Sequence, residues 1–230
     1  MRLTADLLFQ APTYVNAIKD RELLLRSHRI PLIENLGITK DLNDVIDLSD
    51  NDIRIIGNFP KMTRLKGLLL SQNRISNIQA NISELLPNLE SLILTANSLS
   101  QLADLDPLAG FSKLEHLSLV DNPVTARDHY RSYIIWRIPS LRVLDFEKIK
   151  DSERKFAAQL FGTVSAPTEL ASQIMKTKTA TSKVDLGRGA SASIVKLTDE
   201  DKAKLRESLK NATSLAEIDR IEKALRTGVL

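Results

Sequence analysis

The chain of 230 residues contains no cysteine, one tryptophan and only 4% aromatic residues. Without cysteine it cannot form disulfides, zinc ribbons, iron–sulfur clusters or a cysteine nucleophile, and this absence fits a reducing compartment. No run approaches the roughly 18 apolar residues that span a bilayer, so we expect no membrane association. Asp6 interrupts the apolar stretch at the N-terminus, which predicts that no signal peptide is present.

Leucine is abundant: 28 of the 37 leucines precede residue 145. Many follow one pattern, a leucine, two residues, Leu-x-Leu, two residues and an asparagine. Four units contain Asn51, Asn73, Asn97 and Asn122, and a degenerate unit has His28 in the asparagine position. The period of 22 to 25 residues lies within the leucine-rich-repeat range. We therefore predict an α/β fold, a leucine-rich-repeat solenoid with a curved parallel sheet.

The repeat has a direct physical interpretation. The two leucines of Leu-x-Leu point to the same side of a short strand, so stacked strands bury them together. After each strand the backbone turns, and the asparagine amide can satisfy the exposed N–H and C=O groups. The asparagines are therefore interpreted as structural, and His28 as a structural substitute.

A solenoid must cover its two end layers, and we expect helical end caps. At the front, residues 4–19 are predicted to form a helix with Thr4 as N-cap and a break at Pro12, with its apolar stripe made by Leu7, Leu8, Tyr14, Val15 and Ile18. At the back, we predict a helix over 127–138, a last strand over 141–146 and a helix over 151–161.

Composition divides the chain into three parts. Residues 1–160 are predicted to form the leucine-rich-repeat domain with its N- and C-terminal caps. Residues 163–196 contain five basic and two acidic residues and few large apolar ones, so we expect a disordered basic linker. Residues 197–230 regain helical periodicity and predict a C-terminal helical segment that docks on a partner.

No catalytic motif is present, and His28, His116 and His129 lack metal-ligand spacing. The acidic run at 47–52 lacks the glycine and glutamate of a calcium loop. We therefore expect a protein that is not an enzyme and needs no cofactor or metal.

The outward-facing strand residues form the candidate binding surface. The central column is expected to read Leu24, Asp47, Leu69, Ile93, Ser118 and Val143. Leu69 and Ile93 form an apolar patch on adjacent strands, a mark of contact sites, and Asp47 offers a charge to a helix laid in the groove. The alternative is that these are ordinary strand residues. The predicted partner-binding residues are Leu24, Asp47, Ser49, Leu69, Ser71, Ile93, Thr95, His116 and Ser118.

The sequence indicates direct nucleic-acid binding less strongly than protein binding, because the repeat region is neutral and has no aromatic stacking platform. Four basic residues near the front edge are candidates for accessory phosphate contacts: Lys19, Arg21, Arg26 and Arg29. A solvated charged edge explains each of them equally well.

Several segments together resemble one family, the A-prime family of the U2 small nuclear ribonucleoprotein, over about residues 1–160. The most distinctive segment is Ile30-Pro31-Leu32-Ile33-Glu34-Asn35-Leu36-Gly37. The others lie at 14–23, 46–51, 97–99, 105–108, 122–125, 129–131 and 142–146, and the region around 211–215 also looks similar.

The resemblance implies a nuclear, non-enzymatic scaffold of pre-mRNA splicing. Family members bind the B-double-prime protein, a partner with an RNA-recognition motif, by gripping one of its helices in the concave sheet. Together the two proteins bind a stem-loop of U2 small nuclear RNA, and other spliceosome proteins are further expected partners. The alternative is a leucine-rich-repeat regulatory subunit that targets a nuclear phosphatase or another enzyme.

Overall fold

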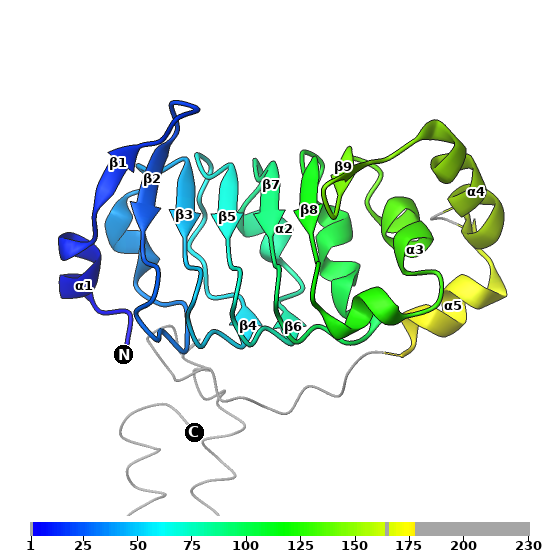
Figure 1. Ribbon diagram of the computed structural model, residues 1–230, viewed down its shortest axis with the longest axis horizontal. Coiled ribbons are helices and arrows are strands. Elements are labelled where there is room, and N and C mark those ends of the chain that lie inside the picture. Colours follow the sequence, from blue (N-terminus) through cyan, green and yellow to red (C-terminus); the bar gives the residue numbers. More distant parts are fainter. Residues whose placement is uncertain (1, 164–165, 178–230) are drawn as a thin grey trace, which may run out of the picture. The chain divides into compact units, whose positions relative to one another are not determined.

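The computed structural model describes residues 2–163 and 166–177 (Figure 1). Within them, one sheet has the strand order β1-β2-β3-β5-β7-β8-β9-β10, with parallel pairing from β2 to β9. This confirms the predicted parallel sheet. Its two edge strands are β1 (Thr13–Val15) and β10 (Glu147–Lys148). The parallel strands are β2 (Arg21–Leu24), β3 (Val45–Asp47), β5 (Gly67–Leu69), β7 (Ser91–Ile93), β8 (His116–Ser118) and β9 (Val143–Leu144).

Short elements complete each repeat on the side away from this sheet. Strands β4 and β6 pair in parallel, and Figure 1 shows them at the opposite edge of the solenoid from β3, β5 and β7. The bounds are β4 (Ile55–Ile56), β6 (Asn77–Ile78), α2 (Ile82–Leu85) and three 3-10 helices, η1 (Leu36–Thr39), η2 (Leu102–Gly110) and η3 (Pro123–Ala126). No helix in the described part of the chain is long and apolar enough to cross a membrane.

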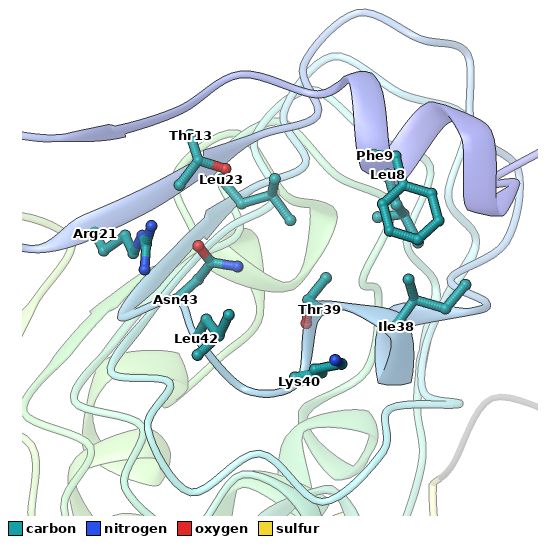
Figure 2. Close-up of a pocket in the computed structure, with 10 residues that line it drawn as sticks. All are labelled: Leu8, Phe9, Thr13, Arg21, Leu23, Ile38, Thr39, Lys40, Leu42 and Asn43. Atoms are coloured by element: carbon teal, nitrogen blue, oxygen red, sulfur yellow. The ribbon is translucent and has the colours of Figure 1, made fainter.

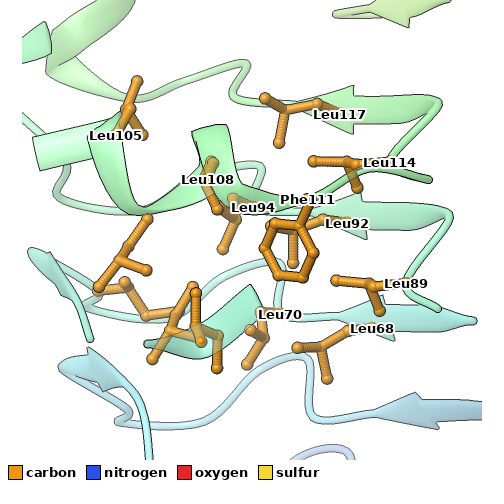
Figure 3. Close-up of a cluster of buried hydrophobic side chains, with 14 of the residues drawn as sticks. Leu68, Leu70, Leu89, Leu92, Leu94, Leu105, Leu108, Phe111, Leu114 and Leu117 are labelled. Carbon is orange, nitrogen blue, oxygen red and sulfur yellow. The ribbon is translucent and has the colours of Figure 1, made fainter. Parts of the chain in front are cut away.

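The core lies between these two sides. Leu68, Leu92 and Leu117 are register partners on β5, β7 and β8, and none is more than 2% exposed. Figure 3 shows them stacked toward Phe111 and Leu108, which approach from the η2 side. The Leu-x-Leu alternation therefore buries its leucines as predicted, and this stacking holds the repeats together.

The asparagines form the predicted ladder. The Asn97 amide nitrogen donates to the carbonyls of Leu94, 3.0 Å away in its own turn, and Leu70, 2.9 Å away in the preceding repeat. Its amide oxygen accepts from the N–H of Ile75 at 2.9 Å. Asn51, Asn73 and Asn122 make equivalent contacts. These side chains are structural, as the sequence indicated.

The front cap differs from the prediction of a helix over 4–19. Helix α1 (Ala5–Gln10) begins after Thr4, whose hydroxyl accepts from the Leu7 N–H as expected, and it ends before Pro12, where a break was predicted. No helix follows the break within residues 12–19, all of which the structure describes. The next residues form β1 (Thr13–Val15), which pairs antiparallel with β2. Proline lacks an N–H and disfavours helix in the residue before it, so the chain turns into the sheet instead.

The back cap agrees with the prediction. Helix α3 (Tyr130–Arg137) and helix α4 (Asp151–Phe161) pack together, and the rings of Tyr133, Trp136 and Phe161 lie 5.4–5.8 Å apart. Beyond β9 the sheet ends with β10 (Glu147–Lys148), an antiparallel strand that the sequence did not indicate.

The expected linker does not begin at residue 163. After β11 (Gly162–Thr163), residues Ala166–Pro167 form β12 and Glu169–Met175 form α5, and Ala171 is fully buried. Apolar residues at helical spacing, Leu170, Ile174 and Met175, pack against the core. The rest of the predicted linker and the predicted helical segment at 197–230 lie outside the described residues.

Candidate partner-binding surface

The concave column is assembled as predicted over five strands. Leu24, Asp47, Leu69, Ile93 and Ser118 are successive register partners from β2 to β8. The sixth expected member is wrong, because Val143 pairs with His116 and therefore belongs to the neighbouring column. The turn after β9 places Asp145 beyond Leu117, whose carbonyl accepts the Asp145 N–H at 2.9 Å.

Leu69 and Ile93 form the apolar centre of this surface. They are direct register partners on adjacent parallel strands and both are partly exposed. Ser71 and Thr95, two residues further along the same strands, are also partly exposed, and His116 is exposed at one side. The small polar residues leave these two side chains as the main apolar contact area on the central strands.

Three of the predicted contact residues have little surface to offer. Asp47, Ser49 and Ser118 are only 6%, 2% and 1% exposed. The Asp47 carboxylate accepts the Ser49 N–H at 2.8 Å and lies 3.9 Å from the Arg26 guanidinium. Ser118 shares a 2.9 Å hydrogen bond with Thr95. These groups are satisfied within the chain, so they form the floor of the groove beneath the exposed residues.

The structure adds Tyr14 to the concave face. Tyr14 is the register partner of Glu22, and its hydroxyl donates to the Glu22 carboxylate at 2.9 Å. This hydrogen bond is the main reason why the pKa of Tyr14 is raised. Because a helix was predicted over residues 4–19, Tyr14 was not among the predicted residues of the concave face. Thr13, Tyr14 and Val15, directly after Pro12, nevertheless favour a strand.

The four candidate RNA-contacting residues are not brought to one place. Lys19 lies in the turn of the β1–β2 hairpin, and Arg26 is paired with Asp47. Arg21 points away from the concave face, because it alternates with Glu22 along β2. Arg29 lies in a separate hollow with Asp50, Asp52 and Arg74. A single basic surface is therefore not formed by these side chains.

The site has the features of a binding surface, and no catalytic arrangement was predicted for it. Among the residues that the structure describes, no three His, Asp or Glu side chains are grouped so that they could hold a metal ion. What the surface offers chemically is an apolar patch with a polar border on a rigid sheet.

Comparison with known proteins places this fold in a family. Residues 1–175 match the family model described as "Leucine-rich repeat". The U2 small nuclear ribonucleoprotein A' of Schizosaccharomyces pombe is 47% identical, with 99% of this chain and 98% of that protein covered. The protein of the same name from Homo sapiens is 44% identical, over 99% of this chain and 89% of its own length.

A solved structure agrees with these relatives. A chain in the crystal structure of the Drosophila melanogaster SNF/U2A' complex superposes with a TM-score of 0.69 and 50% sequence identity, covering 72% of this chain and 95% of that one. The comparisons confirm the predicted fold and family and support a role in splicing. The chain belongs to the leucine-rich-repeat family of U2 small nuclear ribonucleoprotein A' proteins.

Proposed function

We propose that this chain is a non-enzymatic scaffold of the U2 small nuclear ribonucleoprotein, acting in the nucleus in pre-mRNA splicing. Its concave face binds a helix of a partner that carries an RNA-recognition motif, the B-double-prime protein. The pair then binds a stem-loop of U2 small nuclear RNA.

One observation carries the proposal. The partly exposed side chains of Leu69 and Ile93 adjoin in the middle of a rigid parallel sheet, on a chain whose solved relative was crystallised as a complex with a second protein. An apolar stripe of a helix fits such a patch, and the polar border formed by Ser71 and Thr95 leaves room for its side chains.

The RNA contribution is expected to come mainly from the partner. The basic residues of this chain are dispersed, and Tyr14, the only aromatic residue that the structure places on the strands of the concave face, is held by Glu22. Without stacking aromatics, the isolated chain should bind the stem-loop weakly and with a steep dependence on salt concentration. Tight, salt-resistant binding by this chain alone would contradict the proposed division of roles.

Co-purification from nuclear extract tests the assembly. Tagged full-length chain is expected to recover U2 small nuclear RNA together with an RNA-recognition-motif protein. Recovery of a phosphatase without U2 RNA would instead favour the regulatory-subunit alternative. If neither the RNA nor the partner is recovered, the proposal fails.

A further inference from the structure

A second surface lies at the front end of the solenoid, on the side of the sheet away from the concave face. A pocket of about 290 Å³ opens between α1, the β1–β2 hairpin and the segment around η1 (Figure 2). Leu8 and Leu23, nearly buried, form its base, while Phe9 and Leu42 are 75% and 50% exposed at its wall. Two large apolar side chains thus remain in water beside a preformed hollow.

The Asn43 side chain distinguishes this pocket from an ordinary surface hollow. Asn43 is only 4% exposed as a residue and lines the pocket, and its amide has no hydrogen bond with a described residue. No described side-chain N or O atom is both inaccessible to solvent and unpaired, so the Asn43 amide meets solvent at the pocket. Figure 2 shows the amide among Leu23, Leu42 and Thr39. The Asn43 amide therefore presents one acceptor and two donor positions to a ligand that enters the pocket.

The charge of the pocket has one sign. Arg21 and Lys40 are exposed at its border, and neither side chain has a hydrogen bond or ion pair with a described residue. Among the described residues that line the pocket, none is acidic. The nearby Asp41 accepts from Thr63, and Asp44 accepts from the backbone N–H of Arg21 and from the Arg64 guanidinium, so both carboxylates are already paired. The border is therefore complementary to an anionic ligand.

We propose that this front pocket binds a short acidic segment of a partner protein that carries one bulky apolar side chain. The apolar side chain fills the space between Leu8, Leu23 and Leu42. Acidic neighbours in the segment pair with Arg21 and Lys40. The Asn43 amide pairs with a peptide group of the segment, because a peptide offers a C=O to accept from the Asn43 NH2 and an N–H to donate to the Asn43 oxygen.

A protein segment fits these observations better than a nucleic acid does. The hollow is mostly apolar, and the Phe9 ring stands at its wall, so the space itself calls for an aliphatic or aromatic side chain. The proposal does not depend on the concave surface. Arg21 and Glu22 alternate along β2, so the two surfaces lie on opposite faces of that strand.

Titration of the full-length, ¹⁵N-labelled chain with a defined peptide tests the proposal. The probe is the acetylated and amidated peptide Asp-Glu-Leu-Glu-Asp, and the readout is the Asn43 side-chain amide signal, assigned by its loss in Asn43→Ala. We expect saturable shifts of this signal with a Kd of about 1 mM or tighter. The same peptide with serine in place of leucine, or with Lys-Arg-Leu-Arg-Lys as its sequence, should bind at least about tenfold more weakly.

Matched variants separate the pocket from general charge effects. Lys40→Glu and Asn43→Ala should each weaken binding at least about tenfold, measured for Asn43→Ala from the backbone signal of Leu42. Lys148→Glu, the same charge reversal on β10 at the far edge of the sheet, should leave the affinity unchanged. Ile93→Lys should also leave it unchanged, which distinguishes failure here from failure of the concave-face proposal.

Three results would overturn the inference. The first is no saturable shift at Asn43 with the acidic peptide, which would leave the amide to water alone. The second is equal affinity for the acidic and basic peptides. The third is that oligouridylate shifts the Asn43 signal at lower concentration than the acidic peptide, which would make the pocket an RNA site.

Discussion

The hydroxyl of Tyr130 donates a 2.7 Å hydrogen bond to the carboxylate of Asp145. The other oxygen of that carboxylate accepts the N–H of Leu119 at 2.7 Å. One side chain thus joins the first turn of α3 to two strand ends at the back of the solenoid. Where the last repeat has no asparagine, Asp145 takes over the task of satisfying the backbone.

Tyr130→Phe should therefore destabilise the protein. The substitution removes a hydrogen bond from the buried Tyr130 to the partly exposed carboxylate of Asp145, and hydrogen bonds to charged groups are worth about 1.5–3 kcal/mol. Tyr14→Phe is the matched control, since its hydroxyl also bonds a carboxylate but the ring is 45% exposed. Urea denaturation of both variants measures the difference, and an equal loss of unfolding free energy in the two would contradict this account of the back cap.

Asn97→Ala should weaken the solenoid in its middle. The amide pairs with three backbone groups of two consecutive repeats, on Leu70, Ile75 and Leu94, and each group left unpaired costs about 1–3 kcal/mol. Asn81→Ala is the control, because Asn81 is exposed and its side chain makes no cap hydrogen bond to α2. Urea midpoints should fall for Asn97→Ala only. Equal urea midpoints of the two variants would contradict the structural role of the asparagine ladder.

Lowering the pH should remove the contribution of the Asp44 carboxylate to the stability of the fold. Its carboxylate accepts the N–H of Arg21 at 2.9 Å and pairs with Arg64 at 3.0 Å, and these contacts lower its pKa. Because the pKa is lower in the folded chain than the value of about 3.9 in the unfolded chain, the stabilisation is present above about pH 4. It is lost as the pH falls through the folded pKa.

Asp44→Asn should thus be less stable than the parent at pH 7, and the gap should narrow as the pH approaches about 2. Unfolding free energies from urea titrations at pH 7, 5 and 3 measure this trend. Asp121→Asn, at an exposed turn, controls for the change of net charge. A gap that stays constant with pH would show that the Asp44 charge contributes nothing.

Much of the fold follows from the repeat, because a leucine pattern that returns every 22–25 residues has few ways to bury itself. The same pattern places Leu69 beside Ile93. Prediction from the sequence fails where the leucine pattern ends. At Thr13–Val15 a helix period and a strand fitted the same apolar residues, and pairing with β2 decided between them. At Glu169–Met175 the helix gains stability from packing against the core, which composition does not reveal.

The pocket at Asn43 was also hidden from the sequence. Its residues come from α1, the β1–β2 hairpin, η1 and the segment after η1, and only the closure of the front cap brings them together. Nothing in the order of residues indicates that the amides of Asn51, Asn73, Asn97 and Asn122 pair with the backbone while the Asn43 amide pairs with none of the residues that the structure describes.

The central claim is that the concave patch holds the partner protein. Ile93→Lys should leave the fold intact, since the side chain is partly exposed in the free chain. In the complex the introduced lysine would be a buried, unpaired charge, so the affinity for the partner protein should fall at least about 100-fold. Ile55→Lys is the matched control, a partly exposed isoleucine on β4 at the opposite edge of the solenoid.

Calorimetric titration of each purified full-length variant with the RNA-recognition-motif partner is the most direct measurement. The account predicts that the parent and Ile55→Lys bind alike, while Ile93→Lys binds at least about 100-fold more weakly, with unchanged circular dichroism and urea midpoint. Unchanged affinity of Ile93→Lys for the partner would contradict the assignment of the concave face.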